Sequence, residues 1–262
     1  MRTTAKVAGY ELRDVLRSRW LIGYTLFFLV VTDALFRFGG GEKALLSLVN
    51  VVLFLIPLVA IVFSTVYLYA AREFTELLLT QPIRRRQVFG GLYLGLALPL
   101  SLSFVAAVVV PFIVHGGIAG ARPVTLVALL VTGVALNFIF TALAILIVAC
   151  TEDRLKGLGI AVALWLFLAV LYDGLVLLLI SIMADHPLER PLLAMMLANP
   201  MDLARVGLLL QFDVAALLGY TGALLQKFFG RSMGVAVTAT AMASWIILPF
   251  LAGMRAFQKK DF

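Results

Sequence analysis

The sequence predicts an all-α integral membrane protein with six transmembrane helices, an N-terminal interfacial amphipathic helix and a re-entrant outer helical hairpin before the last span. Of its 262 residues, 63% are hydrophobic and only 13% are charged, whereas soluble domains carry about 25% charged residues. Apolar runs long enough to cross the hydrocarbon core, which needs about 20 residues, recur along the chain. Short charged segments separate these runs, and residues 1–262 are expected to form a single transmembrane domain.

The N-terminal residues 2–19 are predicted to form a helix on the membrane surface. Four apolar residues can share one side of it: Val7, Leu12, Val15 and Leu16. Trp20 follows where an aromatic belt residue would lie. The alternative is a plain basic tail. No small-residue cleavage site closes the next apolar run, so we expect no cleavable signal peptide.

Six apolar runs are long enough to span the membrane. The predicted spans are residues 20–38, 44–71, 88–115, 123–150, 157–184 and 232–254. Prolines inside them are tolerated because neighbouring helices satisfy the freed carbonyls.

Residues 72–87 (REFTELLLTQPIRRRQ) interrupt the apolar pattern. No lipid-facing span can hold this many charges, so the stretch is predicted to be a short amphipathic helix at the cytoplasmic surface that docks a soluble partner. Residues 73–79 are the piece expected to contact it. The block Arg84 to Arg86 is expected to remain near anionic headgroups and to orient the third span.

Residues 185–230 are apolar but broken by prolines and charges. They are predicted to form two short helices that dip into the membrane from the outer side: residues 192–210, broken at Asn199-Pro200, and residues 214–229. With six spans and both termini inside, 14 of the 21 Lys and Arg residues lie in the cytoplasm. This bias follows the positive-inside rule. If 214–229 were a true span, the basic C-terminal tail would face outward.

Motifs for catalysis are missing from the sequence. It contains no phosphate-binding G-x-x-x-x-G-K-[ST], no H-E-x-x-H and no G-x-S-x-G. We therefore expect a non-enzymatic chain. The net charge of +7 is assigned to membrane topology rather than to nucleic acid. The one cysteine, Cys150, excludes an internal disulfide and a Cys-based metal cluster.

Asp173 is expected near the middle of the fifth span, where an ionisable residue is expensive and indicates function by default. The alternative is that a neighbouring polar group satisfies it and that it only fixes packing. Asp33, near the outer end of the first span, is expected to be simply solvated. Outer-side thioether and imidazole groups suit copper, but methionine also fills gaps in apolar segments, and no metal site is predicted. These groups are His115, Met183, His186, Met195, Met196 and Met201.

Three segments resemble the ABC type-2 permease family, in particular its NosY-like branch. Residues 10–21 (YELRDVLRSRWL) resemble the family's opening, with Tyr10 where a Lys or Arg is common. Residues 72–95 are similar to the family's charged loop after the second span, but Leu92 or Tyr93 stands where a Lys is usual. Residues 198–210 (ANPMDLARVGLLL) resemble its outer N-P-x-D-x-x-R motif.

The resemblance implies a multi-pass permease of the bacterial inner membrane that works with a second permease copy and a dimeric cytoplasmic ABC ATPase, which binds ATP and Mg²⁺. It assigns residues 72–87 as the coupling helix and 151–156 as a second, smaller contact. The implied coupling residues are Arg72, Glu73, Phe74, Glu76, Leu77, Leu78, Glu152, Asp153 and Arg154. The implied outer-loop contacts are Asn199, Pro200, Asp202 and Arg205.

Three interpretations remain open. The first is a permease that exports a substrate such as a lipid, a drug or a polysaccharide. The second is a permease that transmits ATP-driven motion to a periplasmic protein, as expected of a copper-site maturation system. The third, a membrane enzyme or scaffold without an ATPase, is disfavoured by the missing catalytic residues.

Overall fold

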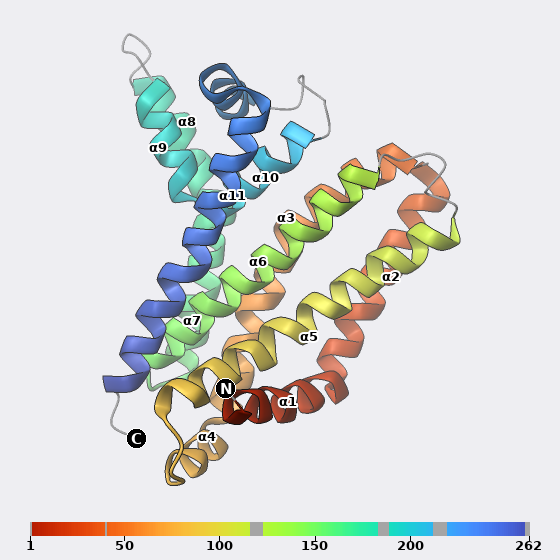
Figure 1. The fold of residues 1–262 in the computed structure, drawn as a ribbon. Helices are drawn as coiled ribbons and strands as arrows, with labels where there is room; N and C mark the ends of the chain where they lie inside the picture. Colours follow the sequence, from red (N-terminus) through yellow and green to blue (C-terminus); the bar gives the residue numbers. More distant parts are fainter. Residues whose placement is uncertain (1, 40, 116–122, 183–188, 212–218, 260–262) are drawn as a thin grey trace.

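The computed structural model describes residues 2–39, 41–115, 123–182, 189–211 and 219–259. Within these ranges six helices are long and apolar enough to cross a membrane, which confirms the predicted fold class. They are α2 (Arg19–Gly39), α3 (Gly41–Ala70), α5 (Arg85–Val114), α6 (Pro123–Cys150), a continuous rod of α7 (Arg154–Leu166), η1 (Phe167–Leu171) and α8 (Tyr172–Ile182), and α11 (Gly219–Lys259) from Met233 onward. Figure 1 shows their arrangement.

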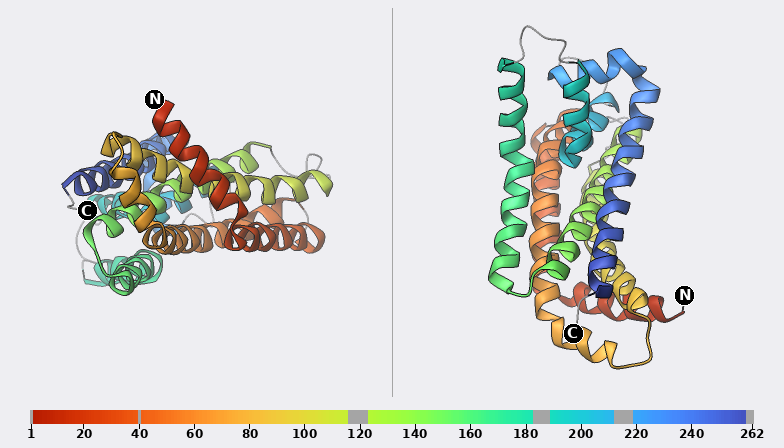
Figure 2. Two further views of the ribbon diagram at one scale, coloured as in Figure 1. Left: turned by 90° about the horizontal axis from the view of Figure 1, so that it is seen from below. Right: turned by 90° about the vertical axis from the view of Figure 1, so that its left-hand side faces the viewer.

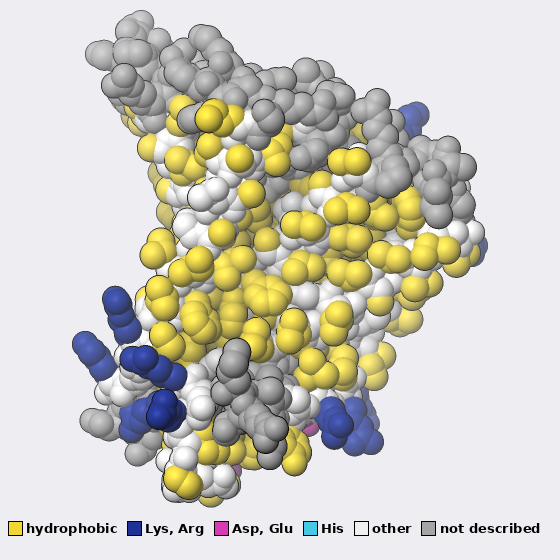
Figure 3. All heavy atoms as spheres, viewed as in Figure 1, with side chains coloured by type: hydrophobic (Ala, Val, Ile, Leu, Met, Phe, Trp, Pro, Cys, Tyr) yellow, Lys and Arg dark blue, Asp and Glu magenta, His cyan; other side chains and the backbone are white. Residues whose placement is uncertain are grey.

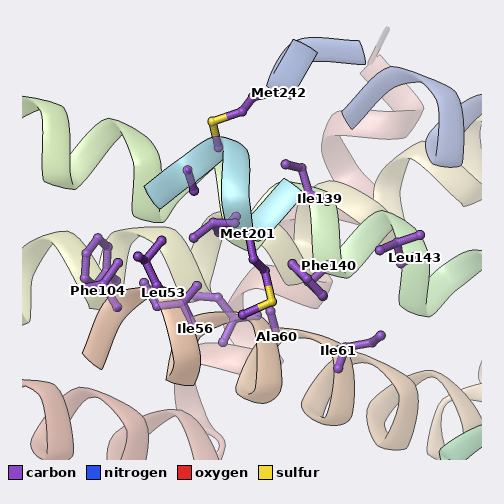
Figure 4. Close-up of a cluster of buried hydrophobic side chains, with 14 of the residues drawn as sticks. Leu53, Ile56, Ala60, Ile61, Phe104, Ile139, Phe140, Leu143, Met201 and Met242 are labelled. Carbon is purple, nitrogen blue, oxygen red and sulfur yellow. The ribbon is translucent and has the colours of Figure 1, made fainter. Parts of the chain in front are cut away.

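The interior of the bundle is built mainly by α3, α5 and α6. Half or more of the most apolar stretch of each is buried, 61% in α6, against 17% in the α7–α8 rod and in α11. Figure 4 shows Ile56 of α3, Phe104 of α5, and Ile139 and Phe140 of α6 in this core. The rod and α11 therefore present most of their apolar side chains outward, to lipid or to another protein.

The helix α1 (Arg2–Arg17) lies across the lower end of the bundle, where it packs mainly against α5 (Figures 1 and 2). Within α1, the side chain of Val15 is fully buried against the bundle, whereas that of Leu16 is exposed. The close crossing of α1 over α5 depends on Gly95, because a Cβ at that position would overlap the Cβ of Glu11. On the visible face, Lys and Arg side chains gather at this same end, below an apolar belt (Figure 3).

The structure confirms the first predicted helix of the hairpin, residues 192–210 with a break at Asn199-Pro200. Helices α9 (Glu189–Ala198) and α10 (Pro200–Gln211) are bent by 104° at Asn199. The sequence break at Asn199-Pro200 predicts this bend, because the residue before a proline is driven away from helical conformation.

The second predicted helix of that hairpin, residues 214–229, is wrong as a separate element. Residues 219–229 form the first turns of α11, which continues without interruption to Lys259; residues 214–218 lie outside the described ranges. Lys227 and Gly230 end an apolar run in the sequence, but neither ends a helix, since a helical glycine costs only about 1 kcal/mol.

Candidate functional site

The helix α4 (Arg72–Leu79) projects from the lower end of the bundle between α3 and α5 (Figure 1). Its start is fixed by Thr75, whose buried hydroxyl donates to the Ala71 carbonyl at 2.9 Å. Arg72 pairs with Glu76 one turn later at 2.9 Å. Glu76, one of the implied coupling residues, is therefore paired within its own helix.

The predicted extent of this helix, 72–87, is too long. It ends at Leu79, and residues 80–84 form a turn before α5 begins at Arg85. Pro82 accounts for the difference, because a proline removes a backbone donor and restricts the residue before it.

The exposed side of α4 consists of Glu73, Phe74 and Leu77, which we call the α4 face. Phe74 is 47% exposed and Leu77 is 64% exposed. Leu78, which the resemblance grouped with them, instead packs half-buried against the core. The α4 face is thus two apolar side chains and one acid, a composition that suits burial in a protein groove.

The second predicted contact, residues 151–156, lies beside the lower end of α3. The Tyr69 hydroxyl donates to the Thr151 carbonyl at 3.1 Å. Asp153 caps α7 by accepting from the backbone N–H groups of Leu155 at 2.7 Å and Lys156 at 3.1 Å. These bonds hold the pKa of Asp153 below its usual range. Asp153 therefore fixes the start of α7.

Glu152 and Arg154 are exposed beside this cap. Their charged side chains are thus exposed to a partner at the second contact, whereas the Asp153 carboxylate accepts hydrogen bonds from the backbone at the start of α7.

A carboxyl pair on α1, which sequence analysis did not single out, contacts the last turn of α3. The Tyr67 hydroxyl lies 2.5 Å from Glu11 Oε2 and 2.8 Å from Asp14 Oδ2. A phenol carries one hydrogen, so it cannot donate to both carboxylates. The cluster is fully hydrogen-bonded when one carboxyl is protonated.

Glu11 is the carboxyl suited to carry that proton. Its side chain is buried, and this burial raises its pKa; the Tyr67 bond opposes the rise and the nearby Asp14 charge adds to it. The sequence contained a signal for this pair, namely two acids, Glu11 and Asp14, in an otherwise basic helix. Nothing in the sequence pointed to Tyr67, 56 residues away, as its partner.

At the other end of the molecule, a π-helical turn in the fifth span receives the bend between α9 and α10. Within η1, the Leu168 carbonyl accepts a hydrogen bond from Asn199 Nδ2 at 2.9 Å. The same Asn199 side chain accepts from the backbone N–H of Met201 at 2.9 Å. One fully buried amide thus caps α10 and ties it to the fifth span.

The last carbonyls of α9 are also satisfied by side chains. The Tyr172 hydroxyl donates to Met195 O at 2.6 Å, and the Trp245 indole N–H donates to Leu197 O at 3.1 Å. Helix ends leave such carbonyls without partners inside the helix. The bent pair is therefore anchored to both the fifth span and α11.

Asp173 does not stand alone in the membrane. Its Oδ2 lies 3.3 Å from Arg205 Nη1, and Asp202 Oδ1 lies 3.6 Å from the same nitrogen. Asp173 is about 28 Å along the rod from Arg154 and about 14 Å from its other end at Ile182, at 1.5 Å per residue. Its location near the middle of the membrane stays a prediction.

Other predicted outer residues are placed differently from the expectation. Asn199 and Pro200 are buried, so neither side chain is available for direct contact with a partner, whereas Arg205 is about half exposed. Asp33 is not simply solvated: it pairs with Arg37 at 2.9 Å and with His115 at 2.7 Å.

Two of the methionines that were considered for copper pack in the core. Met196 and Met201 are buried in the core cluster, and Met183 and His186 lie outside the described residues. Among the residues that the structure describes, no group of three His, Cys, Asp or Glu side chains could hold a metal ion.

Comparison with known proteins gives consistent matches over nearly the whole chain. A family model described as ABC-2 family transporter protein matches residues 5–262. A probable ABC transporter permease protein NosY of Pseudomonas aeruginosa is 27% identical over 264 residues, covering 94% of this chain and 92% of that protein. A protein of the same description from Stutzerimonas stutzeri is 26% identical over 280 residues, covering 99% of both chains.

Proposed function

Because this chain belongs to the ABC-2 transporter family, we propose that it is the membrane permease subunit of an ABC transporter and that a separate cytoplasmic ATPase drives it through the α4 face. The observation that carries the proposal is the exposure of Phe74 and Leu77 on a short helix outside the bundle. The chain has no phosphate-binding motif of its own, so ATP and Mg²⁺ belong to the partner.

The lower end of the bundle is assigned to the cytoplasm. It holds α1, α4, the 151–156 loop and the end of α11 (Figures 1 and 2). With this orientation 14 of the 21 Lys and Arg residues are cytoplasmic, in keeping with the positive-inside rule. Both termini then lie in the cytoplasm, and the six spans cross the bacterial inner membrane.

Two permease copies are expected in the working complex. Most of the apolar stretch of the α7–α8 rod and of α11 is left uncovered by this chain. These faces are available to a second copy of the permease as well as to lipid.

Co-purification with the ATPase tests the α4 face. Phe74→Ala and Leu77→Ala are expected to lower recovery of the co-expressed ATPase at least tenfold, as truncation of an interface anchor costs about 2 kcal/mol or more. Phe38→Ala is the matched control, because Phe38 is 90% exposed and lies at the end of α2 that is remote from α4. Full recovery of ATPase by both α4 variants would remove this surface from the proposal.

A second candidate function is transmission of motion to a periplasmic protein without classical translocation. The supporting observation is the rod itself, which begins at the 151–156 loop and is tied at its other end to the bent pair through Leu168, Tyr172 and Asp173. Movement at the cytoplasmic end of the rod would reach the outer pair through these bonds.

Two measurements separate transmission from export. Pull-down of a periplasmic protein that is lost in Arg205→Ala but kept in Arg37→Ala, an outer arginine elsewhere on the surface, favours transmission. ATP-dependent accumulation of a lipid, drug or polysaccharide in inverted vesicles favours export.

A further inference from the structure

An apolar groove lies between the lower halves of α2 and α3. Its volume is about 810 Å³, and its walls include Gly23 and Phe27 of α2 and Leu58 and Phe63 of α3. A Cβ added to Gly23 would meet nothing within 4 Å. The groove is therefore open space at membrane depth, lined almost wholly by hydrocarbon.

The groove has the length of one membrane leaflet. On α3 its lining runs from Leu55 to Ala70, about 22 Å at 1.5 Å per residue. On α2 it runs from Ser18 to Phe27, about 14 Å by the same rise. Half of the hydrocarbon core is about 15 Å thick. A single acyl chain that starts at the lower end would thus follow the groove toward the bilayer centre.

The lower mouth of the groove is polar and positive. Ser18, Arg19 and Trp20 line it where α1 ends and α2 begins, and Tyr67 lines it from α3. Trp20 is 76% exposed, as suits a residue at headgroup level. No ion pair is formed by Arg19 among the described residues, so its guanidinium is available for a phosphate.

From these features we propose that the groove is a binding site for an anionic glycerophospholipid of the cytoplasmic leaflet, with one acyl chain between α2 and α3 and its phosphate at Arg19. The first N–H groups of α2 lack partners within the helix and would add donors beside Arg19. Tyr67 lines this groove and also the separate pocket that holds Glu11 and Asp14. The phenol thus stands between the phosphate position and those carboxyl groups.

A second copy of the chain is a poorer occupant. Arg13 and Arg17 are exposed on α1 next to the mouth. In a symmetric dimer the same patch meets itself, so these arginines and Arg19 would face their own copies. An anionic headgroup is attracted to the same charges.

Lipid retention by the purified full chain tests the site. The protein is extracted in detergent, offered phosphatidylglycerol or phosphatidylcholine, and analysed by native mass spectrometry. Wild-type protein is expected to retain phosphatidylglycerol preferentially. Arg19→Gln is expected to lower that preference about tenfold, the effect of losing one charged hydrogen bond. Gly23→Leu adds a side chain whose Cβ meets nothing within 4 Å and whose remaining carbons enter the groove, so it is expected to abolish retention of both lipids.

Matched controls locate the effect. Gly159→Leu places the same side chain in open space on α7, and Arg255→Gln removes an exposed arginine elsewhere at the lower end; both are expected to retain lipid like wild type. Wild-type retention by Gly23→Leu overturns the proposal. So does a disulfide between two copies of Gly23→Cys in a Cys150→Ser background, because it shows that a second copy covers the groove. ATPase co-purification is measured separately and does not enter this result.

Discussion

Asn199 offers the sharpest test of how the outer bent pair is held. Its buried side chain donates to the Leu168 carbonyl and accepts from the Met201 N–H, each at 2.9 Å, and donates a longer bond to Asp202 Oδ2 at 3.4 Å. Asn199→Ala removes all three, and the two short bonds dominate the expected effect. Loss of a helix cap costs about 1 kcal/mol, and leaving the buried Leu168 carbonyl without a donor costs about 1–3 kcal/mol. We therefore expect Asn199→Ala to lower the free energy of unfolding by about 2–4 kcal/mol.

Asn199→Ser separates the two contributions. A serine can still accept the Met201 N–H as a cap but is too short to replace the bond to Leu168. We expect it to be more stable than Asn199→Ala by about 1 kcal/mol and less stable than wild type. Unfolding in mixed micelles can be followed by the fluorescence of Trp245, whose indole binds the neighbouring Leu197 carbonyl. The reasoning fails if Asn199→Ala unfolds like wild type, or if the serine and alanine variants are equal.

Three other predictions concern contacts that the sequence did not reveal. The pKa of Glu11 is raised in the folded protein, so the folded state binds the extra proton and stability falls as pH rises from about 4.5 through that raised pKa. The melting temperature of wild type should therefore drop relative to that of Glu11→Gln over this range. Parallel plots of melting temperature against pH for the two proteins would contradict this prediction. For Asp173 and Arg205, a double-mutant cycle with Asp173→Asn and Arg205→Gln should give a coupling energy below about 1 kcal/mol, since both side chains are half exposed; a coupling near 3 kcal/mol would indicate a buried pair. Gly95→Ala should destabilise the protein by about 1–3 kcal/mol, because the new Cβ would overlap Glu11; unchanged thermal unfolding would show that α1 moves aside at no cost.

Hydropathy and turn chemistry predicted most of the architecture because each acts locally. The fourth predicted span, 123–150, coincides with α6, and Asn199-Pro200 marks the bend of 104°. The α4 segment was predicted as a surface helix because lipid cannot hold its charges. Its helix is shorter than predicted because Pro82 removes a backbone donor and restricts the residue before it.

The errors share a cause with the missed contacts. The predicted break between the helix 214–229 and the span 232–254 does not occur, because backbone hydrogen bonds carry α11 from Gly219 through this region. Asp173 was considered without Arg205, which lies 32 residues later in the chain. Neither partner of that pair has a local signal for the other.

That this chain forms a membrane bundle with a charged surface helix follows from its composition alone, because burial in lipid constrains composition residue by residue. The meetings between polar groups depend instead on how the helices pack: Glu11 meets Tyr67, Asn199 meets the carbonyl of Leu168, and Asp173 meets Arg205. Such pairs form where helices distant in sequence cross, and the crossing is set by the packing of whole helices against one another. The groove between α2 and α3 arises in the same way, since neither helix alone encodes the space between them.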